Sequence, residues 1–230
     1  VGLKWDFILV HESGHEWFGN NISTKDIADM WVHESFTNYS ETLYTGCEVG
    51  EEFATTYNVG CRALIGNLEP IIGTYDVNHE GGGDMYYKGG SMLHTMRAVI
   101  DDDEKFRQIL RGLNKTFRHQ TVTTKQVEDF VSKEAGIDFS KVFDQYLRTT
   151  DIPVLDVSLV EKKTKDGREM LLQYRWTKCV PGFNLPLLVK LEPNKWTWIR
   201  PTTERQTTNF KMENLSEFAV DRRFYVKVKK

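Results

Sequence analysis

The chain has 230 residues, of which 40% are hydrophobic and 12% aromatic, enough to build one large or two small domains with a real core. Charged residues make up 27%, the formal net charge is −3, and no cluster of Lys and Arg occurs, so a nucleic-acid partner is not expected. No apolar run approaches the roughly eighteen residues needed to span a bilayer, so we expect no transmembrane segment. Three cysteines without close spacing predict buried free thiols.

The first helix is expected over residues 5–20 and contains His11-Glu12-Ser13-Gly14-His15. Histidines four positions apart lie one turn above the other on a helix, where both imidazoles can bind a single metal ion. Glu12 is turned about 100° from His11 around the helix axis, so it flanks the metal and can act as general base for a metal-bound water. The alternative is a helix whose two histidines bind nothing, and it requires a chance match of three fixed residues.

The same helix carries apolar residues all around its axis: Trp5, Phe7, Ile8, Leu9, Val10, Trp17 and Phe18. A helix that is apolar on every side is buried on every side. We therefore expect this chain to be a fragment of a longer protein, whose missing N-terminal region packs over the helix.

A second helix is expected from about residue 30 to residue 44, with an apolar side and a more polar side. Glu34 lies on it, 19 positions after His15, a distance that suits two antiparallel helices joined by a loop. His33 points about 100° away from Glu34 and is a poor ligand. Glu41, two turns from Glu34 on the same face, either orients a metal-bound imidazole or is an ordinary solvated charge.

Two histidines and one carboxylate, with a fourth position open to water, form a catalytic zinc site. The sequence therefore predicts one zinc ion per chain, bound by His11, His15 and Glu34. Zinc lowers the pKa of its water to about 7, and Glu12 can take the proton as the water attacks a polarised carbonyl. The resulting oxyanion needs a hydrogen-bond donor besides the metal.

Candidate donors follow a third expected helix, at about 51–65, and a loop rich in Gly, Asn and Asp at about 66–85. Tyr86 and Tyr87 stand where this loop leads into a helix that ends near Ile100, and each offers a phenolic O–H. Aromatic pairs at a helix start also pack in cores, so the residues alone do not show whether Tyr86 or Tyr87 is the donor.

The pattern changes at Pro153. Before it, amphipathic helices are expected at 104–117, 124–134 and 139–148, so residues 1–152 predict a mainly helical catalytic lobe that is truncated at its N-terminus. After it, runs of period two predict a β-sandwich over 153–230, with a turn at Lys165-Asp166-Gly167. We expect strands at 155–159, 170–176, 185–191, 196–199, 208–212, 217–220 and 224–228. The predicted fold class is α+β.

Three motifs occur in a recognisable order: His-Glu-Ser-Gly-His-Glu-Trp-Phe-Gly-Asn from residue 11, Trp-Val-His-Glu-Ser-Phe from residue 31, and Tyr-Tyr-Lys-Gly-Gly from residue 86. They resemble the membrane alanyl aminopeptidase family of gluzincin zinc metallopeptidases, which has a thermolysin-like lobe. The resemblance is strong over roughly residues 5–100 and looser beyond. It implies the same zinc ligands, Glu12 as the base, and Tyr86 rather than Tyr87 as the tyrosine that stabilises the transition state.

The sequence departs from the family at His33 and Ser35, where the family has Asn and Gly. It also lacks the upstream Gly-x-Met-Glu-Asn motif, whose glutamate holds the free amino group of the substrate; Lys211-Met212-Glu213-Asn214 lacks the glycine. The resemblance therefore implies removal of N-terminal residues from peptide substrates for the full-length protein, whereas the missing N-terminal region favours inactivity of the fragment alone. Two alternatives stay open: a thermolysin-like endopeptidase, and a non-catalytic fragment that binds a peptide or a partner.

Overall fold

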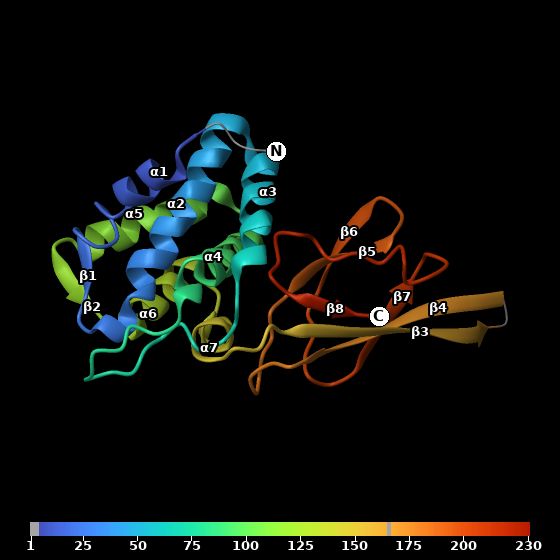
Figure 1. Cartoon of the computed structure of the whole chain (residues 1–230). Helices are drawn as coiled ribbons and strands as arrows, with labels where there is room; N and C mark the ends of the chain where they lie inside the picture. The colour runs from blue at the N-terminus through green and yellow to red at the C-terminus, as the bar shows by residue number, and fades with distance from the viewer. Residues whose placement is uncertain (1–4, 165–166) are drawn as a thin grey trace. The chain divides into compact units, whose positions relative to one another are not determined.

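The computed structural model describes residues 5–164 and 167–230, and the chain divides into two compact units at Thr150 and Asp151 (Figure 1). This division lies two residues before the predicted boundary between 152 and 153. Helices make up most of the first unit and strands most of the second, so the fold is mixed, as the pattern predicted.

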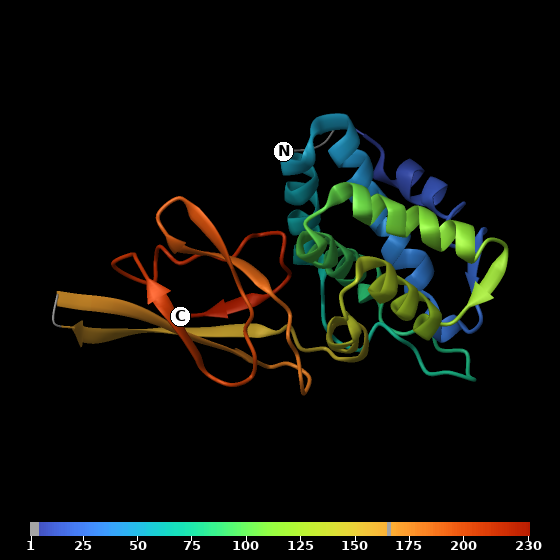
Figure 2. The ribbon, with the colours of Figure 1, turned by 180° about the vertical axis from the view of Figure 1, so that it is seen from behind.

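The first unit contains seven α-helices among its described residues, and α2 runs through the middle of them (Figures 1 and 2). Its helices are α1 (Phe7–Gly14), α2 (Trp31–Val49), α3 (Glu51–Cys61), α4 (Tyr87–Ile100), α5 (Asp103–Thr116), α6 (Thr124–Ala135) and α7 (Ser140–Arg148). α2 packs against α1, α3 and α4, and its Trp31 and Tyr39 are fully buried. Within the described residues, no helix combines the length and the apolar character needed to cross a membrane.

The helix boundaries follow from capping residues. The Asp6 carboxylate accepts a hydrogen bond from the Ile8 N–H and begins α1. Thr123 and Gln126 form a reciprocal capping box that begins α6, and Gly136 ends it in the left-handed conformation at φ 66°. These signals are local, which explains why most of the predicted helices agree with the structure to within a few residues.

The first helix is shorter than predicted. α1 ends at Gly14 rather than continuing to residue 20, and His15 is its C-cap with helical angles of φ −63° and ψ −18°. Phe7, Ile8 and Leu9 are 45%, 47% and 67% exposed, so one side of α1 is open in the described chain, and the burial of that side by a further region of the protein stays a prediction. α2 covers one side of α1, where His11 and Gly14 are buried.

A short parallel pair, β1 (Ile22–Thr24) with β2 (Gln120–Val122), was not predicted from the sequence. Three-residue strands carry too little periodicity to be recognised. The pair joins the segment after α1 to the connection between α5 and α6, and the Lys25 N–H extends it by donating to the Val122 carbonyl at 2.8 Å. It fixes the segment between the two helices that carry the predicted ligands.

The second unit has two sheets. A four-stranded sheet has the order β7-β4-β3-β8, built from β3 (Val154–Thr164), β4 (Gly167–Thr177), β7 (Gln206–Phe210) and β8 (Lys227–Lys229). β5 (Leu187–Glu192) and β6 (Lys195–Ile199) form a two-stranded sheet. The buried ring of Trp176 packs edge-on against that of Phe183 at 5.2 Å in the core. The β-sandwich over 153–230 stays a prediction, and Lys165 and Asp166 of the predicted turn lie outside the described residues.

Two of the predicted strands do not form as expected. Residues 217–220 contain only an isolated bridge between Val220 and Val189, because the Glu217 and Phe218 N–H groups close turns onto the Asn214 and Leu215 carbonyls. The strand expected at 224–228 is shifted and shortened to β8.

The cysteines are free, as predicted, but not buried. Cys47 is exposed, and Cys61 and Cys179 are half-buried. The prediction of buried thiols is therefore wrong, because α2 places Cys47 on the side of its last turns that faces away from the core.

Candidate metal centre

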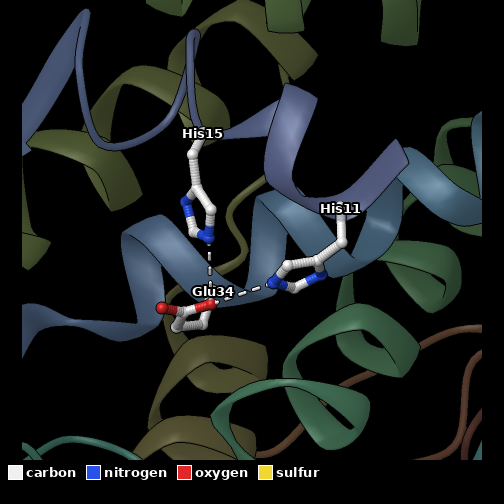
Figure 3. Close-up of side chains that lie close together, drawn as sticks. All are labelled: His11, His15 and Glu34. Carbon is white, nitrogen blue, oxygen red and sulfur yellow. Dashed lines mark ion pairs between the residues drawn. The ribbon is translucent and has the colours of Figure 1, made fainter. Parts of the chain in front are cut away.

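The three residues predicted as metal ligands lie together (Figure 3). His11 Nε2 lies 3.3 Å and His15 Nε2 lies 3.6 Å from the same atom, Glu34 Oε2. The ligands of a tetrahedral zinc ion with bonds of about 2.1 Å lie about 3.4 Å from one another. The two measured separations match this value, so a zinc ion fits these three atoms with only small adjustments.

The charge distribution also fits a cation. Glu34 Oε2 is buried and accepts no hydrogen bond. Burial lowers the pKa of His11, but the nearby carboxylates of Glu34 and Glu41 outweigh burial and raise the pKa to about 9. The site therefore favours an additional positive charge, which a metal ion can supply by displacing the proton.

Both imidazoles are held by their other ring nitrogen. His11 Nδ1 lies 2.8 Å from Glu41 Oε1, and His15 Nδ1 lies 3.1 Å from the Phe18 carbonyl oxygen. A carboxylate and a carbonyl only accept, so each Nδ1 carries the proton and each Nε2 lone pair is directed at the site. Glu41 is 1% exposed, which excludes its alternative role as a solvated charge.

Glu12 and Tyr86 flank the ligands. The Tyr86 ring stacks on that of His11 at 5.7 Å between centroids and 27° between planes. Burial raises the pKa of Tyr86 to about 12, with further contributions from the charges of Glu34, Glu80 and Glu12, so the hydroxyl stays a hydrogen-bond donor at neutral pH. Glu12 is exposed and so accessible to water.

Tyr87 is placed differently. Burial raises its pKa as well, but the carboxylate that adds to this rise is Glu41 rather than Glu34 or Glu12. The charges of Glu34 and Glu12 thus act on the Tyr86 hydroxyl, which favours Tyr86 as the donor at the metal centre.

The structure explains the two departures from the family motif. His33 Nε2 accepts a hydrogen bond from the Thr24 N–H at 3.1 Å, and burial lowers the pKa of His33, so its imidazole is a neutral acceptor that points away from the ligands. Ser35 Oγ donates to the Met85 carbonyl at 2.6 Å. Both side chains therefore form hydrogen bonds that join α2 to neighbouring segments.

The glycines after Lys88 have a packing role that the sequence did not reveal. A Cβ atom at Gly89 would lie 1.8 Å from Ser35 Oγ, and one at Gly90 would lie 2.4 Å from Asn38 Oδ1. Only glycine lets α4 approach α2 this closely. The close approach brings Tyr86, at the start of α4, next to the ligand on α2.

Comparisons with known proteins can now be set beside this geometry. Residues 4–146 match the Peptidase family M1 domain. The chain belongs to peptidase family M1. The resemblance stated from the motifs is thereby confirmed, and the match covers most of the helical unit of this M1 chain.

Curated relatives of the M1 chain are much longer than it is. It is 27% identical over 183 residues to aminopeptidase N of Lactobacillus helveticus, which covers 72% of the chain and 20% of that protein. It is 25% identical over 137 residues to leukotriene A-4 hydrolase of Xenopus laevis, which covers 54% of the chain and 22% of that protein. The chain thus spans about a fifth of the length of the curated relatives it matches.

Solved structures show the same fold. Aminopeptidase A of Legionella pneumophila, solved with aspartic acid, has a TM-score of 0.73 at 15% identity and matches 97% of this chain and 27% of its own. An M1 zinc metallopeptidase of Deinococcus radiodurans has a TM-score of 0.55 at 23% identity and matches 64% of this chain and 33% of its own. At these identities the likeness concerns the fold.

Proposed function

We propose that this chain carries the zinc centre of a metallopeptidase that, in its full-length form, removes N-terminal residues from peptides. The observation that carries the proposal is the convergence of His11 Nε2 and His15 Nε2 on Glu34 Oε2 at separations that suit tetrahedral zinc. Membership in peptidase family M1 supports it, as do relatives named as aminopeptidases and a structural neighbour described as a zinc metallopeptidase.

The motifs and the geometry of the site support the following roles. When bound by His11, His15 and Glu34, one zinc ion supplies an acidic water and polarises the substrate carbonyl. Glu12 takes the proton of the attacking water and passes it to the leaving amine. The Tyr86 hydroxyl donates a hydrogen bond to the developing oxyanion.

Substrate binding needs surfaces beyond those described here. We propose that a further region of the full-length protein packs on the exposed apolar side of α1 and completes the peptide site. Phe7, Ile8 and Leu9 on α1, and Trp17 just after it at 56% exposure, are exposed large apolar side chains, and apolar surface of this kind marks interaction sites. The length of the relatives supports the presence of such a region.

A substitution of Glu12 tests the proposed activity. Zinc content and turnover of aminoacyl anilides are measured for the full-length protein and for Glu12→Gln. We expect about one zinc per chain in both proteins and a loss of turnover of about 10²–10⁴-fold in the variant, the usual contribution of a general base. Glu16→Gln is the control, since Glu16 lies four residues after Glu12, is exposed, and accepts a hydrogen bond from the Asn20 amide at 3.1 Å.

The other outcomes identify the alternatives. Equal hydrolysis of peptides with blocked N-termini would indicate an endopeptidase. Bound zinc without any turnover in the wild-type protein would indicate a non-catalytic binding module. Protein purified without chelator and still free of zinc would contradict the proposed metal centre.

A further inference from the structure

A chain of polar contacts leads from His11 away from the metal centre to α3. Glu41 lies on α2, two turns after Glu34, and is almost fully buried. One carboxylate oxygen, Oε1, receives His11 Nδ1–H at 2.8 Å and the Asn38 amide at 3.2 Å. The other oxygen, Oε2, receives the hydroxyl of Tyr57, which lies on α3.

We propose that Tyr57 is a positioning residue for the metal centre, because its hydroxyl holds the Glu41 carboxylate in the orientation that aims His11 Nε2 at the metal. The inference rests on the proposed zinc site and deepens it. It adds a residue from α3, a helix that carries none of the predicted ligands.

The physical reason lies in the burial of Glu41. A buried carboxylate is stable only when donors satisfy its oxygens. Without the Tyr57 hydroxyl, Oε2 becomes a buried acceptor that has lost its donor, which favours rotation of the carboxylate. Such a rotation weakens the bond to His11 Nδ1–H and leaves the ring free to turn or to change tautomer.

Tyr57 is suited to this role. Its side chain is half-buried, and burial followed by the hydrogen bond to Glu41 raises the pKa of the hydroxyl, so it remains a donor at all ordinary pH values. The Trp5 ring packs against the Tyr57 ring at 5.6 Å and against the Tyr44 ring at 5.2 Å. Trp5 therefore restricts the movement of Tyr57 away from Glu41.

The two histidines differ in how they are held. His15 Nδ1 is bonded to the Phe18 carbonyl in its own turn, with Thr37 Oγ1 at 3.3 Å. That orientation depends mainly on local backbone. The orientation of His11 instead depends on side chains from α2 and α3, so substitutions at Tyr57 should act on the metal through His11.

The test compares Tyr57→Phe with Tyr44→Phe in the 230-residue chain. Tyr44 is a matched control because its ring packs on the same Trp5 and its side chain is 39% exposed. Zinc dissociation constants are measured by competition with a chelator, and circular dichroism of the metal-free proteins checks that both fold. We expect Tyr57→Phe to weaken zinc binding about 10–100-fold, the usual effect of removing a group that orients a ligand. Tyr44→Phe should stay within about 3-fold of wild type.

A double-mutant cycle with Glu41→Gln separates positioning from a general structural effect. If Tyr57 acts through Glu41, adding Tyr57→Phe to Glu41→Gln should change zinc affinity little further, whereas independent effects would add. The absorption bands of bound cobalt(II) give a second readout, since a displaced His11 changes the coordination geometry.

The outcomes are distinguishable from those of the proposed function. If wild type binds zinc and Tyr57→Phe binds it as tightly as Tyr44→Phe does, or if the effects of Tyr57→Phe and Glu41→Gln simply add, the positioning role is wrong. If wild type binds no zinc, the proposed metal centre itself fails.

Discussion

Replacement of Glu34 by Ala removes the atom on which both imidazoles converge. His11 Nε2 and His15 Nε2 lie 3.3 and 3.6 Å from Glu34 Oε2, so the variant leaves two neutral nitrogens without the carboxylate that balances the charge of the metal. Zinc should then bind much more weakly, and the stability that zinc gives to the folded chain should largely disappear.

The size of the effect follows from the linkage between binding and folding. Free zinc at 100 times the dissociation constant stabilises the folded state by about 2.7 kcal/mol. Loss of an outer-shell group costs about 10–100-fold in metal affinity, so loss of a ligand should cost at least about 100-fold. At the same zinc concentration the stabilisation then falls to about 0.4 kcal/mol. A zinc-induced rise in Tm of about 5–11 °C should shrink to about 1–2 °C, at about 2–4 °C per kcal/mol for a chain of this size.

The assay is a thermal melt of the 230-residue chain, followed by circular dichroism at 222 nm, with chelator and with buffered zinc. Glu48→Ala is the control, because Glu48 is an exposed carboxylate on the same helix α2. It should keep the full zinc-induced rise. A Glu34→Ala protein that keeps more than half of the wild-type rise would refute the reasoning that Glu34 is a ligand.

Three further predictions follow. Gly89→Ala should destabilise the chain by about 1–3 kcal/mol in urea unfolding, because the added Cβ meets Ser35 Oγ at 1.8 Å. Gly60→Ala is the control and should not destabilise the chain, because its added Cβ meets nothing within 4 Å. Equal effects of the two substitutions would contradict the packing role of Gly89. Tyr86→Phe in the full-length protein should lower kcat about 10²–10³-fold with zinc retained, and an unchanged kcat would exclude Tyr86 as the oxyanion donor. The Ala28 and Asp76 N–H groups hold the pKa of Asp26 below its usual range, so its charge stabilises the fold above the unfolded pKa of about 3.9, and this contribution is lost as pH falls through the folded value. Asp26→Asn should therefore be less stable than wild type at pH 7, and the gap in urea unfolding should narrow as the pH falls below the unfolded pKa of about 3.9; a gap independent of pH would refute this.

The sequence by itself determined the parts of this protein that depend on local geometry. The helical period places His11 and His15 on one side of α1, and the capping residues Thr123 and Gly136 fix the ends of α6. The motif order around Glu34 and Tyr86 predicted family M1, which the domain match confirms. These features are readable because each is encoded within one helix or one short segment.

Only the tertiary structure decided which side chains meet across helices. Periodicity gives the angle of Glu41 around α2 but not what covers it, so its burial against His11 and Tyr57 could not be predicted. For the same reason, the hydrophobic residues of α1 do not show which segment covers them, and Leu9 is 67% exposed in the described chain. A helix side becomes core, metal site or surface according to the segments that pack on it, and residues distant in the sequence supply those segments.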